Sequence, residues 1–263
     1  MILTRRVSLN DVQLDSLDGR ILIQGVEDGT PRRSVNAVSI YGTDGQRMTG
    51  DRREALDITV RFAIMLGKRQ AEERDKIFDK VLLWASSGGW LRYSGKPGKM
   101  IYVKCTATPG VGDYTQWNSD YSLTFRAYGV PYWVSETETQ KSAVRVSSKA
   151  LTLSNAGTTK SPLEMEFTNN STECNTVQIS ANGRVIRLTD LGLETNETLV
   201  IDHDSDGLQR IRIRDTDGVY RSAMANRTEA SADEVWLFPG SNRVTLSAQK
   251  AGDITVRCRG RFL

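Results

Sequence analysis

Apolar and polar residues alternate along the stretch ALDITVRFAIML (residues 55–66), and this period of two predicts a long strand with one buried face. The apolar side consists of Leu56, Ile58, Val60, Phe62, Ile64 and Leu66, and Asp57, Thr59 and Arg61 point the other way. The same period continues in KMIYVKCTA, through Ile101, Val103 and Cys105, and in YSLTFRAYG, through Tyr121, Leu123, Phe125 and Ala127. The first half of the chain is therefore expected to be mainly β.

One stretch in this half has a different period. In QAEERDKIFDKVLLWASSGG the apolar residues recur at steps of three and four, which predicts one amphipathic helix over about residues 70–87. The residues of its apolar face are Ala71, Ile77, Phe78, Val81, Leu82 and Ala85. Gly88 and Gly89 follow directly, where a glycine can adopt the left-handed conformation that ends a helix.

The second half shows no helical period and many turn signals, which favours an all-β sandwich. In TVQISANGRVIRL, a type I′ turn at Asn182-Gly183 pairs Ala181 with Arg184 and so fixes the register outward. Ile179 then lies opposite Ile186, and Val177 lies opposite Leu188. Two apolar pairs across one hairpin support this turn assignment.

Between the two halves, SETETQKSAVRVSSKA loses aromatic residues and becomes rich in small polar ones, as expected of an exposed connection. With 263 residues the chain is long enough for about two domains. We therefore predict an N-terminal β-sandwich or barrel-like domain with one helix over residues 1–135, a linker over 136–150, and a C-terminal β-sandwich over 151–263.

Charge and cysteine content narrow the function classes. A balance of 35 basic against 32 acidic residues leaves a formal charge of +3, too small for the basic face of a nucleic-acid-binding protein. The three cysteines are far apart and form no CxxC pair, so we expect reduced, packed thiols rather than a zinc or redox site. No apolar run reaches the roughly 18 residues of a membrane span, and the N-terminus lacks a signal-peptide core. A soluble protein made in a cytoplasm is expected.

The best candidate for a metal site is the stretch LVIDHDSDGLQRIRIRD (residues 199–215). Asp202, Asp204, Asp206 and Gly207 match the first half of an EF-hand loop, but the twelfth position is Ile213 instead of the required glutamate. A hairpin explains the stretch better, because Ile201 then opposes Ile211, Leu199 opposes Ile213 and Asp202 opposes Arg210. Residues 203–209 become its polar loop, and a calcium site of another kind at the three aspartates remains the minor alternative.

Catalytic chemistry has little support. His203 is the only histidine, so any serine or cysteine nucleophile would have one possible histidine base, and no nucleophile motif accompanies it. Its place in a polar loop predicts a surface residue. We expect no enzyme, no cofactor and no resident metal.

The order of the parts carries more information than any single motif. DRREALDITVRFAI, the helix with its sequel ERDKIFDKVLLWASSGGWLRYSGKPGKMIYVKC, and YSLTFRAYGVPYW resemble the N-terminal half of distal tail proteins of siphovirus-type phages and prophages. In the second half the matching pieces are SNAGTTKSPLEMEF, ETLVID, LFPGSNRVTL and ITVRCRGRFL. The resemblance covers nearly the whole chain.

This resemblance implies an N-terminal domain that assembles into a hexameric ring, related to tail-tube proteins, and a C-terminal galectin-like β-sandwich. Such rings are baseplate hubs at the distal end of the tail in the virion. They join the tail tube protein to a tail-tip fibre or lysin-bearing protein, and in many phages to receptor-binding proteins. Their subunits are assembled in the cytoplasm of the bacterial host.

For the ring contact, SIYGTDGQRMTGDRRE before the long strand is expected to form a projecting hairpin, with Tyr41, Arg47, Arg52 and Arg53 at the interface between subunits. The alternative function is a carbohydrate-binding adhesion module that acts through the C-terminal sandwich. True galectins bind sugar with histidine, asparagine, arginine and tryptophan in a fixed strand pattern, whereas this half has one histidine and one tryptophan, Trp236.

Overall fold

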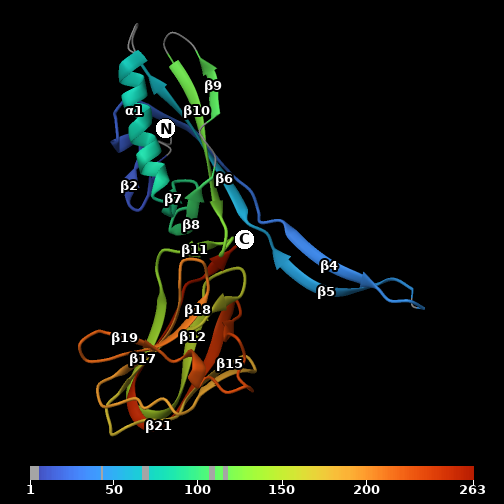
Figure 1. The fold of residues 1–263 in the computed structure, drawn as a ribbon, viewed down its shortest axis with the longest axis vertical. Coiled ribbons are helices and arrows are strands. Elements are labelled where there is room, and N and C mark those ends of the chain that lie inside the picture. Colours follow the sequence, from blue (N-terminus) through green and yellow to red (C-terminus); the bar gives the residue numbers. More distant parts are fainter. Residues whose placement is uncertain (1–5, 43, 67–70, 107–109, 115–117) are drawn as a thin grey trace. The chain divides into compact units, whose positions relative to one another are not determined.

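The structure is a computed structural model that describes residues 6–42, 44–66, 71–106, 110–114 and 118–263. The chain divides into two compact units, Met1–Trp133 with Leu263, and Val134–Phe262. Both units consist mainly of strands, and α1 (Ala71–Ser86) is the one α-helix in the described ranges (Figure 1). The predicted mainly β fold is therefore confirmed. Within these ranges, no helix is long and apolar enough to cross a bilayer.

The first unit is built on one antiparallel sheet. Its elements are β1 (Val7–Leu9), β2 (Val12–Gln13), the 3-10 turn η1 (Leu14–Ser16), β3 (Ile21–Asp28), β4 (Arg33–Ser39), β5 (Gln46–Arg53), β6 (Leu56–Met65), α1, β7 (Gly89–Tyr93), β8 (Lys99–Cys105), β9 (Gly110–Tyr114) and β10 (Asn118–Ala127). The strand order is β2-β1-β7-β8-β10-β6-β3, with β9 also paired to β10. Strand β6 alternates as predicted, because Leu56, Ile58, Val60, Phe62 and Ile64 are all buried.

Helix α1 covers this sheet with the predicted apolar face. Ile77 and Val81 are buried, and Phe78 stacks on Tyr121 of β10 with 4.7 Å between ring centroids. Nearer the C-terminal end of the helix, Trp84 meets Phe125 edge to face. The helix ends where Gly88 takes a φ of +59°, so the predicted C-terminal glycine signal is confirmed. Residue 70, the predicted start, lies outside the described residues.

The second unit is an antiparallel β-sheet structure wrapped around one apolar core. Its elements are β12 (Thr139–Asn155), β13 (Ser161–Pro162), β14 (Glu164–Asn169), β15 (Val177–Ala181), β16 (Arg184–Leu188), β17 (Thr198–His203), β18 (Gln209–Arg214), β19 (Tyr220–Ser222), the 3-10 turn η2 (Met224–Asn226), β20 (Trp236–Leu237), β21 (Gly240–Cys258) and β22 (Arg261–Phe262). Strand β11 (Trp133–Ser135) contains the point where the chain passes from one unit to the other. The main order is β16-β15-β21-β14-β17-β18-β19.

Both predicted hairpin registers in this unit are confirmed. Strand β15 pairs with β16 so that Ile179 meets Ile186 and Val177 meets Leu188. Asn182 takes the positive φ of 52° that the type I′ turn requires.

The predicted linker over residues 136–150 is wrong. Residues 139–155 form strand β12, which pairs with β21 along most of its length. Within the described residues it pairs with one strand, β21, and most of its side chains are exposed, so selection for a buried face is weak and its composition resembles that of a loop. A bulge near Arg145, which has a φ of 51°, interrupts the alternation further.

Candidate functional site

The three aspartates of the candidate cation site do not converge. Asp202 lies in β17. Its carboxylate accepts hydrogen bonds from Nε of Arg210 at 3.0 Å and from Nη2 of Arg212 at 2.5 Å. Asp204 uses its Oδ1 atom to accept the backbone amides of Asp206 at 3.0 Å and Leu208 at 2.9 Å. Within the described ranges, no group of three or more His, Cys, Asp or Glu side chains could hold a metal ion.

A second loop repeats this arrangement and shows what the aspartates do. In DTDGV (residues 215–219), Asp215 accepts the amides of Asp217 at 3.0 Å and Val219 at 2.8 Å. Gly207 and Gly218 take matching φ values of 81° and 85°. DSDGL and DTDGV are thus two copies of one hairpin loop, in which the first aspartate holds the turn. The similarity of these two five-residue strings is visible in the sequence alone.

The prediction that His203 lies on the surface is wrong. The register of β17 with β18 confirms the predicted hairpin, because Ile201 lies opposite Ile211 and Asp202 lies opposite Arg210. The ladder extends one pair further than expected, however, and pairs His203 with Gln209. His203 therefore lies on the same face as Ile201, towards the core, and its side chain is only 6% exposed.

The predicted projecting hairpin is present as β4 and β5. These strands pair with each other and form a two-stranded sheet of their own (Figure 1). Apolar side chains lie uncovered on it: Val35 is 50% exposed, Val38 52% and Met48 58%. A two-stranded ribbon without a covered face is marginal in water, so this hairpin is a candidate interaction surface.

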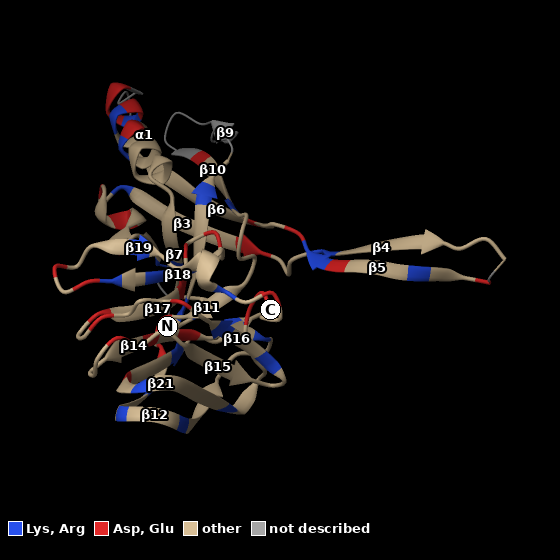
Figure 2. Ribbon diagram, turned by 60° about the horizontal axis from the view of Figure 1, so that its bottom comes forward, with Lys and Arg blue, Asp and Glu red and all other residues tan. Residues whose placement is uncertain are grey.

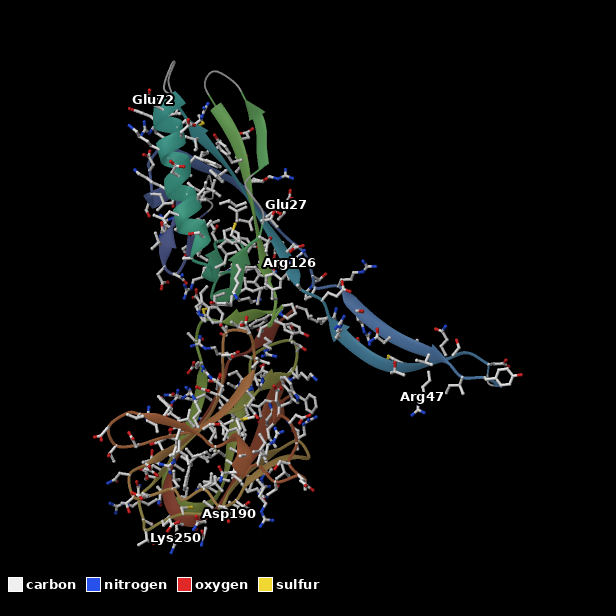
Figure 3. The ribbon with its side chains drawn as sticks, viewed as in Figure 1. Glu27, Arg47, Glu72, Arg126, Asp190 and Lys250 are labelled. Atoms are coloured by element: carbon white, nitrogen blue, oxygen red, sulfur yellow. The ribbon has the colours of Figure 1, made fainter. Side chains whose placement is uncertain are left out.

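The four predicted interface residues all lie on this hairpin. Tyr41 follows β4 and is fully exposed, at 105% of its reference area. Arg47, Arg52 and Arg53 lie on β5, and the Arg47 side chain points away from the ribbon in Figure 3. Arg53 donates to the backbone oxygen of Pro31 at 3.1 Å, which anchors the base of the hairpin.

Basic residues dominate the hairpin. Five arginines occur over residues 32–53, against Asp44 and Asp51, and Figure 2 shows basic residues at the base of the hairpin and along β5. Arg33 and Asp51 form a two-pronged ion pair with N–O distances of 2.8 and 2.6 Å. The Arg33 guanidinium holds the pKa of the Asp51 carboxyl below its usual range. The five arginines outnumber the two aspartates, so the net charge of the hairpin stays positive when the Arg33–Asp51 pair is counted. A partner with acidic groups would suit this charge.

Trp236, the aromatic residue considered for sugar stacking, lies in β20 and is half-buried. Two cations approach its ring: Lys160 Nζ is 4.7 Å from the centroid and Arg261 Cζ is 5.5 Å from it. The indole thus takes part in cation–π contacts within its own unit. Saccharide binding stays a prediction.

No family model matches the sequence, and no curated protein matches it either. Solved structures do match. The SPP1 Dit (gp 19.1) protein, described as a paradigm of the hub adsorption apparatus in phages that infect Gram-positive bacteria, is 15% identical with a TM-score of 0.72. That match covers 98% of this chain and 99% of the SPP1 chain.

Two structures of the phage P2 baseplate also match. One, in its activated conformation with Ca, is 8% identical with a TM-score of 0.53, and covers 98% of each chain. The other, with Sr, has 8% identity, a TM-score of 0.50 and 97% coverage of each chain. At these identities the likeness concerns the fold. The two units of this chain, including the galectin-like β-sandwich, have the fold of the phage distal tail and baseplate hub proteins that the sequence resembles.

Proposed function

We propose that this protein is a structural component of a phage tail tip, a distal tail protein that assembles into a ring. The observation that carries the proposal is the likeness to the SPP1 Dit fold over 98% of the chain, both units included. In this role the protein belongs to the virion, is made in the bacterial host, and acts without catalysis. Its ring, expected to be a hexamer, joins the last ring of the tail tube to the tail-tip fibre or lysin-bearing protein, and receptor-binding proteins are further candidate partners.

The β4–β5 hairpin supports assembly of this kind. Its apolar side chains remain about half-exposed in the single chain, and its arginines lie beside them. Mixed apolar and arginine surfaces are favoured at protein interfaces, because the guanidinium can stack and form several hydrogen bonds. We assign Tyr41, Arg47, Arg52 and Arg53 to the contact with the neighbouring subunit.

The assembly is tested by light scattering after gel filtration, followed by negative-stain imaging. We expect a mass near six times the 29.3 kDa of one chain and ring-shaped particles. A stable monomer at high concentration, without rings, would contradict the proposal.

The hairpin contact is tested with the double variant Tyr41→Ser, Arg47→Glu. It removes the most exposed aromatic side chain and reverses one charge on a surface where neither change disturbs a core, so we expect the ring population to fall at least about tenfold. Val219→Ser is the matched control, because Val219 is 63% exposed on a hairpin loop of the second unit. Equal assembly by the wild type and the double variant would exclude this hairpin as the contact while leaving the tail-tip role open.

A further inference from the structure

The second unit contains a buried polar cluster at the open end of β17 and β18. His203 and Gln209 are the last pair of that ladder, and both lie on the core side of the sheet. Among the residues that the structure describes, neither ring nitrogen of His203 has a hydrogen-bond partner, and neither do the side-chain amide atoms of Gln209. Buried polar groups are nearly always hydrogen-bonded, so this cluster needs an explanation.

Two carboxylates from other elements lie near the imidazole of His203, one beside each ring nitrogen. Glu164 of β14 places Oε1 3.7 Å from Nδ1, and Glu234, just before β20, places Oε1 3.8 Å from Nε2. Both glutamate side chains are largely buried, at 29% and 21% exposure. Both N–O distances are too long for a hydrogen bond. They exceed the upper end of the usual 2.7–2.9 Å of a charge-assisted pair by less than about 1 Å.

The other charged groups near His203 have partners of their own. On the same strand, Asp202 is paired with Arg210 and Arg212, and Nη2 of Arg210 reaches the backbone oxygen of His203 at 3.5 Å. On β21, burial raises the pKa of the Cys258 thiol near Glu164 to about 11, so the thiol is neutral. The backbone oxygen of Glu234 accepts a hydrogen bond from Nε of Arg184. Among the described residues, the carboxylates within 4.0 Å of the imidazole nitrogens are those of Glu164 and Glu234.

The protonation state of the ring decides how many of these contacts can form. A neutral imidazole has one N–H donor and one lone pair, so it can donate to one glutamate only and directs its lone pair at the other. An imidazolium has two N–H donors, one for each carboxylate. Proton uptake would thus allow two charge-assisted hydrogen bonds that join β17 to β14 and to the segment before β20.

We propose that His203, Glu164 and Glu234 form a proton-dependent latch inside the galectin-like unit. The latch is open while the imidazole is neutral and closes when the imidazole takes up a proton. Closure favours the folded state in its protonated form, so the stabilisation grows as the pH falls and is lost as the imidazole gives up its proton. The inference is independent of ring assembly.

Hydrogen exchange of the full-length protein, measured by mass spectrometry at pH 8 and pH 5.5 and corrected for intrinsic exchange rates, tests the latch. Peptides covering residues 163–169 and 229–237 should gain about tenfold protection at the lower pH. His203→Gln, Glu164→Gln and Glu234→Gln should each abolish most of that gain. Glu229→Gln is the matched control, because this exposed glutamate lies in the same segment as Glu234.

The latch would be overturned by a gain in protection that persists in His203→Gln, or by the absence of any gain in the wild type. Should His203→Gln fail to fold, the two glutamate variants decide the question, because each leaves the histidine in place. A loss of the gain in Glu229→Gln as well would show a general charge effect and would also overturn it.

Discussion

The hairpins β4–β5 and β17–β18 have the same local chemistry and opposite surroundings. Each has a two-pronged arginine–aspartate pair across its strands, Arg33 with Asp51 in the first and Arg210 with Asp202 in the second. In β17–β18 the apolar rungs are buried, with Ile201 2% exposed and Ile211 fully covered. In β4–β5 the corresponding valines remain about half-exposed.

The difference shows what a hairpin needs besides its ladder. Burying an isoleucine side chain contributes about 1.5–3 kcal/mol, whereas an exposed ion pair contributes at most about 1 kcal/mol. The core therefore stabilises β17–β18. In the part of the chain that the structure describes, the apolar side chains of the β4–β5 hairpin have no comparable burial, so its stability should depend on what covers it in an assembly.

The largest expected effect comes from truncating one rung in each hairpin. Ile201→Ala should lower the free energy of unfolding by about 3 kcal/mol, because it removes buried methylene groups and leaves a cavity. Val38→Ala should change it by less than about 0.5 kcal/mol in the unassembled chain. Urea unfolding followed by circular dichroism measures both. Equal losses would mean that the β4–β5 hairpin is covered within the single chain.

A pair of glycines at bulges sharpens the same contrast. A Cβ on Gly252 of β21 would lie 2.4 Å from the backbone oxygen of Thr168 and 2.6 Å from Cζ of Phe167, which is fully buried. Gly252→Ala should therefore cost about 2 kcal/mol through overpacking. On Gly50 of β5 the nearest atom, Nδ2 of Asn36, is 3.5 Å away, so Gly50→Ala should be neutral or stabilise by about 0.5 kcal/mol. Thermal unfolding of the two variants, read against the wild type, would show similar losses in both if β5 were packed as tightly as β21.

The features that could be predicted from the sequence are those in which one buried face imposes a period. Strand β6, helix α1 and the register of β17–β18 follow from apolar residues that recur at steps of two or of three and four. The cross-strand pairs fixed the register because a shift by one residue would bury Arg210 or Arg212 in place of Ile211.

The features that could not be predicted lie where no face is selected for burial or where burial is polar. Strand β12 was mistaken for a linker because its exposed side chains carry no period. His203 was mistaken for a surface residue because its buried neighbours, Glu164 and Glu234, come from distant parts of the sequence. The four hairpin residues were found through glycine and arginine content, and their role as a contact is a proposal about another molecule, on which a single sequence carries little information.

An ion pair with a buried carboxylate tests how far charge can replace apolar burial. Arg221 pairs with Glu197, whose side chain is only 8% exposed. Burial alone would raise the pKa of Glu197, but the hydrogen bonds from Arg221 and from the Glu194 amide outweigh it and hold the pKa below the usual 4.5. Arg221→Gln leaves this carboxylate without its cation and should cost about 1.5 kcal/mol at pH 7, a value reduced because Arg221 is half-exposed.

The pH dependence of that loss follows from the sign of the shift. A lowered pKa in the folded protein gives stability that is complete above 4.5 and is lost as the pH falls through the folded value. The difference between the wild type and Arg221→Gln should therefore shrink between pH 7 and pH 3 in urea titrations. A difference that stayed constant over this range would assign the effect to lost packing of the arginine stem.

The smallest effect is expected from the two arginine–aspartate pairs with which the hairpins were compared. Arg210→Gln should cost about 0.5 kcal/mol, because Asp202 keeps Arg212 as a partner at 2.5 Å. Arg33→Gln should leave the unfolding of the unassembled chain unchanged within error, because water solvates both Arg33 and Asp51, at 57% and 36% exposure. If 0.5 M salt abolishes the Arg210→Gln effect, the pair is an exposed one in energetic terms, since screening at that ionic strength acts over a few ångströms. An effect of Arg33→Gln that emerges only in the assembled protein would locate the missing cover of the β4–β5 hairpin in the neighbouring subunit, since burial there converts a solvated pair into one whose loss leaves an unpaired carboxylate.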